Sequence, residues 1–579
     1  MSFKNRKSNY PLYETTHFED FRELVENVAE RYPDRPALVY RNNPKDPEPS
    51  QVTFAEMRDY VRDLGTALVD MGLRDKNVAV VGECLVGWVY AYFALLATGC
   101  ILVPIDKELP AAEIAAIMNK AECEGLIYSS GVVDKANEIR DLVPTLKNFI
   151  EFGPDPAVTA DYAEHMDSVR ERGAKLFAGG DNSYYDYEFD VDRLATIVFT
   201  SGTTGKGKGV MLSIRNLCSD MVQGMYNFQI TYRSIMVLPP HHTFGSTVCF
   251  EGHLAQGCTL YLSSGTRHIL KELQEFKPEH LVLVPLFVET FYKRIMTTAE
   301  KSGKLPMLKK LIKFSDGMRK VGIDLRKPLF KSITESFGGE VKMIICGGAA
   351  LNQDIIDFFE SIGIVILNGY GITECAPLIS CNRNEYRKTG SVGLPIIGGK
   401  VKIIDPDENG EGEIAYSGPN RMLGYYKDEE ATAEVIDEEG YFRTGDYGKI
   451  LTEGEDQWIY ITGRLKNLII FSNGKNIYPE EIETEIQGVY GVNEVVVYAG
   501  ESKSDPYKEI IVAEIYPDAE ALERRGITDP QAHFEKAIKE INARSVPYKS
   551  VGKVKLRDTE FEKNTSRKIL RFKIDKTID

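Results

Sequence analysis

Residues 1–400 alternate between two patterns of hydrophobic and polar positions. Apolar residues recur every three or four positions between Phe18 and Tyr32 and again over Phe54–Met71, which predicts two amphipathic helices. Short apolar runs predict buried strands at Val78–Val81, Ile101–Pro104, Leu126–Tyr128, Leu194–Phe199, Ile235–Leu238, Leu281–Val284, Met343–Cys346 and Ile364–Leu367. Because helical segments separate most of these strands, we expect an α/β domain with mainly parallel sheets and crossover helices.

The pattern changes near residue 400. Short strands and turns over residues 400–460 predict a small β-subdomain, and the segment after Gly463 has an α+β pattern with a helix from Pro479. We therefore predict two domains, a large N-terminal domain over residues 1–463 and a small C-terminal domain over residues 464–579.

Composition excludes several classes of protein. The 579 residues are 43% hydrophobic and 27% charged, as in a soluble multidomain protein, and the net charge of −16 argues against general nucleic-acid binding. Nine cysteines lack C-x-x-C spacing, which favours reduced thiols in a cytosolic protein. The first residues lack the apolar core of a signal peptide, and the apolar stretch Leu85–Ala97 is too short to span a bilayer. We expect a cytoplasmic protein without a transmembrane segment.

The loop from Thr200 to Val210 carries the first sign of chemistry. Its glycines allow backbone amides to approach an anion, and its hydroxyls and two lysines can share the charge of a phosphate chain. Gly202–Lys208 fits the P-loop pattern G-x-x-x-x-G-K, but Gly209 stands where that motif needs Ser or Thr for magnesium. The interpretation without a phosphate is a flexible glycine-rich turn between a strand and a helix.

The lead-in Thr-Ser-Gly-Thr-Thr-Gly closely resembles the phosphate loop of the adenylate-forming superfamily, which includes the acyl-CoA synthetases. Further segments resemble that family's motifs, occur in the same order and together cover nearly the whole chain. They are Leu102–Asp106, Pro239–Gly245, Gly347–Leu351, Asn368–Cys375, Tyr441–Asp446, Gly463–Asn467 and Asn564–Arg571. Any one match can arise by chance, whereas the joint set strongly indicates an AMP-forming ligase.

The resemblance implies a set of nucleotide contacts. They are Thr200, Ser201, Gly202, Thr203, Thr204, Gly205 and Lys208 in the phosphate loop, Gly348, Ala349 and Ala350 in the adenine-side loop, Asn368, Gly369, Tyr370, Gly371 and Thr373 in the next motif, and Asp446 and Arg464 for the ribose or phosphates. Glu374 is the expected Mg²⁺ ligand, since Mg²⁺ takes few carboxylates together with phosphate oxygens. Thr373-Glu374 is also an ordinary helix start, and Asp446 an ordinary turn residue.

The resemblance also implies roles in the C-terminal part. Lys568 is expected to bridge the carboxylate and the α-phosphate during adenylation, and it lies in Lys549–Lys576, a stretch with ten basic and four acidic residues. Lys466 occupies the hinge about which the small domain rotates between half-reactions. Gly474 lies close to the expected path of the pantetheine thiol.

The resemblance implies that the substrate is a carboxylic acid and that the cofactors are ATP, Mg²⁺ and coenzyme A. Gly371 stands where acetate-type members carry tryptophan, and Thr243–Ser246 lacks the aspartate that pairs an amino-acid ammonium. We therefore predict a medium- to long-chain fatty acid in a pocket with His242, Phe244 and Gly371. A ligase that loads a separate acyl carrier protein is the alternative, and a P-loop ATPase or an inactive nucleotide-binding scaffold is a more distant one. Gly207 and Asn467 depart from the family's pattern.

Overall fold

The largest sheet has eight strands and carries the first predicted motifs. The computed structural model describes residues 12–200, 207–471, 476–505, 509–563 and 569–579. The sheet order is β19-β9-β8-β4-β3-β5-β6-β7, and the pairs from β8 to β7 are parallel. The strands are β3 (Asn77–Val81), β4 (Ile101–Ile105), β5 (Gly125–Ser129), β6 (Asn148–Phe152), β7 (Glu164–His165), β8 (Leu194–Thr200), β9 (Lys208–Ser213) and β19 (Gly424–Tyr425).

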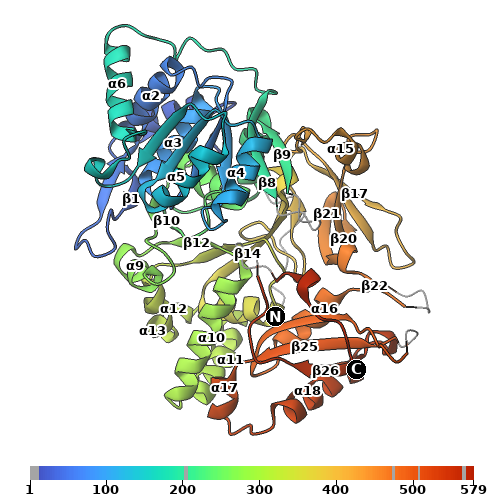
Figure 1. Cartoon of the computed structure of the whole chain (residues 1–579). Helices are drawn as coiled ribbons and strands as arrows, with labels where there is room; N and C mark the ends of the chain where they lie inside the picture. The colour runs from blue at the N-terminus through green and yellow to red at the C-terminus, as the bar shows by residue number, and fades with distance from the viewer. Residues whose placement is uncertain (1–11, 201–206, 472–475, 506–508, 564–568) are drawn as a thin grey trace.

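Helices cover both faces of this sheet (Figure 1). Residues of α4 (Ala111–Lys120) and α5 (Val133–Leu142) share one hydrophobic core with Val81, Ile105 and Ile197. On the other face, α1 (Phe21–Arg31), α2 (Phe54–Asp70) and α3 (Val86–Ala97) belong to a larger core, and α6 (Met166–Ala178) packs along α2. Burial on both faces explains why the strand sequences are continuous apolar runs.

Two further sheets complete the N-terminal part. One has the order β10-β11-β1-β2, and the other has the order β12-β13-β14-β15-β16. Their strands are β1 (Pro36–Tyr40), β2 (Ser50–Thr53), β10 (Arg233–Met236), β11 (Thr259–Leu262), β12 (His280–Leu283), β13 (Met343–Cys346), β14 (Val365–Gly371), β15 (Leu378–Cys381) and β16 (Leu394–Pro395). The helices are α7 (Ile214–Asn227), the π-helix η3 (Phe244–Gly252), α8 (His253–Ala255), α9 (Ile269–Phe276), α10 (Pro285–Lys301), α11 (Leu305–Lys320), α12 (Arg326–Leu329), α13 (Lys331–Thr334) and α14 (Gln353–Ile362).

The predicted β-subdomain is a four-stranded antiparallel sheet with the order β17-β18-β20-β21. It consists of β17 (Lys400–Ile404), β18 (Gly412–Ser417), β20 (Phe442–Glu453) and β21 (Asp456–Arg464), with α15 (Glu429–Val435) beside it. The C-terminal part contains β22 (Ile469–Ile470), β23 (Asn476–Ile477), α16 (Pro479–Gln487), β24 (Val492–Ala499), β25 (Ile511–Pro517), α17 (Ala519–Arg524), α18 (Pro530–Arg544) and β26 (Val551–Leu556).

The hydrophobic cores divide the chain near residue 465. Three core clusters draw on residues up to Ile461, and two others draw only on residues from Ile469 onward. Polar contacts join the two groups, such as the 2.9 Å ion pair between Arg525 Nε and Glu300 Oε1. The domain boundary at 463/464 is compatible with this division and stays a prediction.

The structure corrects the interpretation of the loop after Thr200. Thr200 ends β8 and Lys208 begins β9, and the two strands pair antiparallel with Thr200 opposite Lys208. A P-loop requires a helix directly after the lysine, so that its first amides face the phosphates. The P-loop interpretation is therefore wrong, and so is that of a turn between a strand and a helix.

Candidate active site

β8 and β9 form an antiparallel hairpin at one end of the large sheet, where β19 pairs with β9. At its neck, the Thr200 hydroxyl lies 3.5 Å from the carbonyl oxygen of Lys208. Lys120, the last residue of α4, donates to the carbonyl of Gly207 at 3.0 Å. This contact anchors the chain just before β9 through the Gly207 backbone. The predicted phosphate contacts Ser201, Gly202, Thr203, Thr204 and Gly205 lie outside the described residues.

Tyr425 contacts both the predicted Mg²⁺ ligand Glu374 and the predicted phosphate contact Lys208. Its hydroxyl donates to Glu374 Oε1 at 2.9 Å, and the Lys208 ammonium lies 4.6 Å from the centre of its ring. The tyrosine reaches this position because β19 pairs with β9, which brings residue 425 beside the hairpin. Desolvation and the Glu374 carboxylate raise the pKa of Tyr425, which keeps its hydroxyl a donor. Sequence reasoning missed Tyr425, because a two-residue strand leaves no periodic signal.

The residues at this point fit a magnesium ion shared with phosphates. Thr373 and Glu374 form the start of a single 3₁₀ turn, η5 (Thr373–Cys375), which follows the end of β14 after one intervening residue. Within the described residues, no group of three or more His, Cys, Asp or Glu side chains could hold a metal ion. Mg²⁺ bound through one carboxylate and substrate phosphates needs no such group. Glu374 is therefore a suitable ligand.

Asp446 is the buried centre of a polar network whose third member, Arg464, is exposed. The Tyr370 hydroxyl donates to Asp446 Oδ2 at 2.7 Å, and Arg464 Nε lies 2.9 Å from Asp446 Oδ1. Asp446 and Arg464 are direct neighbours across the antiparallel strands β20 and β21. Asp446 raises the pKa of Arg464, and burial raises the pKa of Tyr370. Three predicted contact residues from two sheets thus meet at one carboxylate.

The predicted adenine-side residues follow β13 and line the edge of the same region. Gly348 adopts a φ of +89°, a conformation that favours glycine, while Ala349 and Ala350 are exposed. Asn368 lies opposite Cys346 in the parallel pairing of β13 and β14, and its carbonyl accepts from the Asn382 amide at 2.9 Å. Asn368, Gly369 and Tyr370 are therefore part of β14, which continues beyond the predicted strand end at Leu367.

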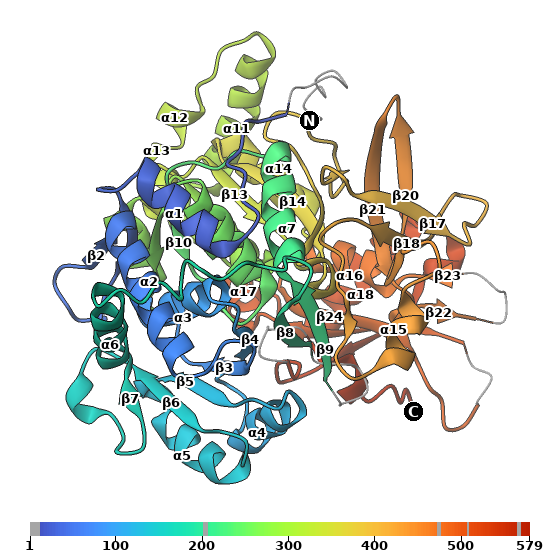
Figure 2. The ribbon, with the colours of Figure 1, turned by 90° about the horizontal axis from the view of Figure 1, so that it is seen from above.

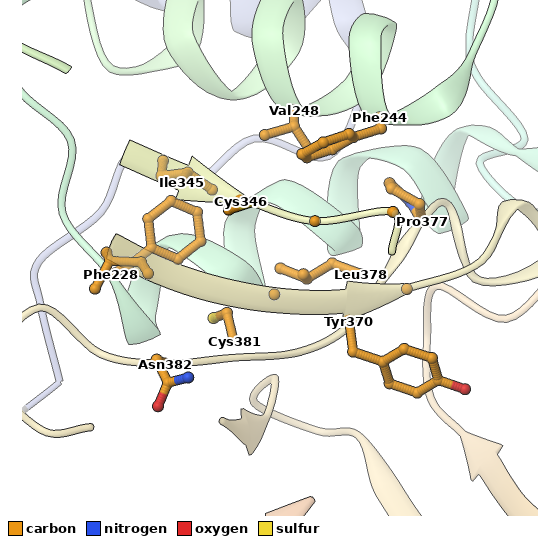
Figure 3. A pocket seen from close by; sticks show the side chains of 15 residues that line it. Phe228, Phe244, Val248, Ile345, Cys346, Tyr370, Pro377, Leu378, Cys381 and Asn382 are labelled. Carbon is orange, nitrogen blue, oxygen red and sulfur yellow. The ribbon is translucent and has the colours of Figure 1, made fainter. Parts of the chain in front are cut away.

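An apolar cavity of about 70 Å³ lies beside this network (Figure 3). Phe244 and Val248 from the π-helix η3 form one wall, Leu378 lies on the strand opposite, and the Tyr370 side chain points away from the space. Phe228, Ile345, Cys346, Gly347, Gly348, Leu367, Gly369, Gly371, Pro377, Cys381 and Asn382 complete the lining. Charged side chains are absent from this lining as the described residues define it.

The cavity changes the argument about two predicted pocket residues. A Cβ atom at Gly371 would lie 2.1 Å from the Pro377 carbonyl oxygen, so glycine is required there by close backbone packing. Among the described lining residues His242 is absent, and its ring instead lies 4.2 Å from that of His241. His241 Nε2 lies 3.5 Å from Asp106 Oδ2, and burial lowers the pKa of His241.

Two buried carboxyl groups belong to or contact the elements that form the cavity wall. Asp220 Oδ1 accepts from the backbone amide of Leu378 at 2.7 Å and from Asn420 Nδ2 at 2.9 Å. Glu251, on η3, is fully buried, and neither of its oxygens has a hydrogen-bond partner among the described residues. Burial raises the pKa of both carboxyl groups well above the ordinary value. Asp220 thus holds the strand that carries Leu378.

The predicted hinge lies directly after the Asp446–Arg464 pair. Lys466 is the middle residue of the 3₁₀ turn η6 (Leu465–Asn467), and Asn467 Nδ2 donates to Glu480 Oε1 at the start of α16. Gly474 and Lys568 lie outside the described residues. The chain flanking residue 568 is described at Lys563 and Ile569, which form an antiparallel bridge.

Known proteins resemble the chain over most of its length. The long-chain-fatty-acid–[acyl-carrier-protein] ligase AEE15, chloroplastic, of Arabidopsis thaliana is 28% identical, over 89% of this chain and 78% of its own. The long-chain-fatty-acid–CoA ligase 1 of Cavia porcellus is also 28% identical, over 81% of this chain and 70% of its own.

Solved structures share the fold. The crystal structure of the anthranilate CoA ligase AuaEII with anthranoyl-AMP superposes with a TM-score of 0.75 at 17% identity, over 98% of this chain and 97% of that one. This likeness confirms the predicted fold class, a large α/β domain followed by a smaller one. The AMP-binding enzyme family matches residues 25–426, which is more than half of the 579 residues. The chain therefore belongs to the AMP-binding enzyme family, as its motifs predict.

Proposed function

We propose that the protein is an ATP-dependent acid–thiol ligase for fatty acids. The observation that carries the proposal is the position of the apolar cavity, whose wall includes Gly371, one residue from Tyr370 and two from Thr373. An acid with its chain in this cavity would present its carboxylate beside Thr373 and Glu374. The polar network around Asp446 lies on the opposite side of β14, where the nucleotide would sit.

The reaction needs two anions to meet. A carboxylate oxygen attacks the α-phosphorus of ATP, the bond to the bridging oxygen breaks, and pyrophosphate leaves with the electron pair. We expect Lys208 to share the charge of the leaving phosphates and Thr373 to hydrogen-bond the α-phosphate. Asp446 accepts from the ribose hydroxyls while Arg464 holds the carboxylate. Mg²⁺, when bound at Glu374, would neutralise phosphate charge.

The second half-reaction consumes the acyl-adenylate. A thiolate attacks the acyl carbon and AMP leaves, which yields a thioester. We propose that the C-terminal domain rotates about the hinge at Lys466 between the two steps, so that the segment around Gly474 replaces Lys568 at the active site. The C-terminal domain over residues 464–579 would move as the second body.

The lining of the cavity favours an aliphatic chain. Asn382 is the one polar side chain that the described residues place at the cavity, because the Tyr370 ring points away from it, and no lining side chain carries a negative charge to pair with an ammonium group. The space of about 70 Å³ corresponds to roughly two water molecules. A medium- or long-chain acid therefore requires wall residues to move, and Phe244 on the π-helix is the side chain that we expect to shift.

Pyrophosphate release across a panel of acids tests the first half-reaction. We expect release with fatty acids from octanoate to palmitate, and weak release with acetate and amino acids. Lys568→Ala should slow it by about 10²–10³-fold while sparing thioester formation from preformed acyl-AMP. Lys576→Ala is the matched control and should change neither step. Equal losses in both steps for Lys568→Ala would refute its role, and phosphate release without pyrophosphate would refute the reaction.

The thiol acceptor is a second question within the proposal. We propose coenzyme A, and loading of a separate acyl carrier protein is the alternative, because relatives with both printed activities are 28% identical. Acyl-AMP incubated with CoA or with holo-carrier protein distinguishes them by the thioester formed. We also propose a cytoplasmic location, since all nine cysteines are free thiols. None of the helices in the described part of the chain is both long and apolar enough to cross a membrane.

A further inference from the structure

The outward face of α11 is apolar where a soluble surface is usually polar. Met307, Phe314 and Val321 are 59%, 54% and 71% exposed, and they recur at a spacing of seven residues, which places them along one side of the helix and its end. Ile323, two residues further on, is also exposed. Large apolar side chains gathered on one exposed face indicate an interaction site.

The exposed side chains Met307, Phe314 and Val321 are not part of the hydrophobic core that holds α11. An adjoining side of α11 packs into the core around α10 and α14 through Leu308, Leu311 and Ile312. Figures 1 and 2 show α11 and α12 at the outer edge of the molecule. The helix is thus fixed by one side, and Met307 and Phe314 remain available on another.

The same segment is strongly basic in an acidic protein. Residues 301–331 contain ten basic and two acidic side chains, a net charge of +8, whereas the whole chain has −16. Lys309, Lys310, Lys313 and Lys320 are exposed around the apolar side chains. The single acid of α11, Asp316, pairs with Arg319 at 3.3 Å. The outward face of α11 therefore has positive and apolar groups and no acid.

We propose that the outward face of α11 docks onto an anionic lipid membrane surface. A helix lying in the interface inserts its apolar side chains between the lipid headgroups while flanking lysines remain at headgroup level. The exposed charges of α11 are all lysines, mobile point charges that suit a fluid layer of phosphates. The arginines of the segment, whose planar groups suit a fixed protein partner, are instead used internally: Arg326 binds Asp324 through two nitrogens at 2.9 and 2.6 Å.

The docking face is connected to the cavity by α10. Val284, directly before α10, approaches within 3.6 Å of where a Cβ of the cavity residue Gly348 would lie. Leu286, in the first turn, is exposed, and the 17-residue helix leads about 25 Å from there to α11. If the proposed function holds, the face brings the enzyme to the phase in which long-chain acids dissolve. Membrane docking itself does not depend on that function.

Vesicle sedimentation of the full chain tests the proposal without any measurement of catalysis. The wild-type protein should sediment with phosphatidylcholine vesicles that contain phosphatidylglycerol and remain in solution with phosphatidylcholine alone. Replacing three outward lysines, Lys309→Glu, Lys313→Glu and Lys320→Glu, should weaken binding by about 100-fold or more, because each lysine near an anionic surface contributes about 1 kcal/mol. High salt should weaken the wild-type interaction in the same direction.

A matched triple variant controls for net charge. Lys175→Glu, Lys536→Glu and Lys539→Glu change exposed lysines of α6 and α18 by the same total charge, and should reduce binding only a few-fold. Phe314→Ser tests the apolar contribution, and should lower the binding that remains at high salt. Equal loss in the two triple variants, or sedimentation with neither vesicle, would overturn the proposal. Binding of an acidic carrier protein through this face, with vesicles ignored, would overturn it in favour of a protein partner.

Discussion

Two glycines on the cavity wall provide a test of where the acyl chain lies. A Cβ atom at Gly369 would make ordinary contacts, 3.6 Å from Leu378 Cδ1 and 3.9 Å from Cys381 Cβ, so a side chain there would grow into the cavity between two lining residues. At Gly371 the new atom would lie 2.1 Å from the Pro377 oxygen. Gly369→Val therefore shortens the cavity, while Gly371→Ala displaces the backbone.

The expected magnitude follows from the area removed. Each methylene buried in the cavity contributes about 0.8 kcal/mol, which corresponds to about fourfold in kcat/KM. Valine adds three carbon atoms, so it should exclude two or three methylenes and lower kcat/KM for long acids by about 15- to 60-fold. Acetate, which does not reach the position, should be unaffected. The preferred chain length should shift downward by the same two or three carbons.

Pyrophosphate release over a series of straight-chain acids measures this profile. Gly371→Ala is the matched control: its Cβ needs about 0.9 Å of additional separation to reach the 3.0 Å that real contacts keep, and overpacking of this kind costs about 1–3 kcal/mol. It should lower the melting temperature and reduce activity with all acids alike. A folded Gly369→Val enzyme with an unchanged chain-length profile would show that the acyl chain binds elsewhere.

Three further predictions concern the polar groups. Tyr370→Phe removes a hydrogen bond to the buried Asp446 carboxylate, and such a bond contributes about 1.5–3 kcal/mol. The substitution should therefore weaken AMP binding, measured by calorimetry, by about tenfold or more. An unchanged affinity for AMP would argue against a role of Tyr370 in positioning Asp446. Tyr425→Phe frees Glu374 from its donor and should change the Mg²⁺ dependence of adenylation while leaving AMP affinity intact; a shift in AMP affinity alone would contradict this. Burial raises the pKa of Glu251 in the folded protein above the ordinary glutamate value of about 4.3. The free energy of unfolding of the wild-type protein should therefore fall as the pH rises from about 4.3 to the folded-state pKa, by at most about 1.4 kcal/mol per pH unit. Glu251→Gln removes that loss, so its melting-temperature advantage over the wild type should grow with pH, and a constant difference would contradict the pKa shift.

Most strands and the family were predictable from the sequence because each depends on local residues. Continuous apolar runs such as Met343–Cys346 are buried on both faces, and the motifs preserve their order. The π-helix η3 was not predictable, since its widened turns depend on packing against α7 and not on a periodic pattern. Tyr425 was also missed, because its role requires a two-residue strand to pair with β9 more than 200 residues earlier.

The site residues divide in the same way. The chemical type of Asp446 and Arg464 was evident from their motifs, but their direct pairing across two strands is a result of tertiary structure. The requirement for glycine at 371 was attributed to room for substrate, whereas the close Pro377 carbonyl explains it. Backbone proximity of this kind leaves no trace in a single sequence.

The pairing of Asp446 with Arg464 has a mechanical consequence. The two residues form the last rung of the β20–β21 ladder, and the 3₁₀ turn at Leu465–Asn467 begins immediately after it. The ion pair therefore joins the two strands immediately before the turn about which we propose that the C-terminal part rotates. In the proposed mechanism the ribose hydroxyls bind the same Asp446 carboxylate that Arg464 contacts, so nucleotide binding and the rigidity of the chain just before the proposed hinge would depend on one side chain.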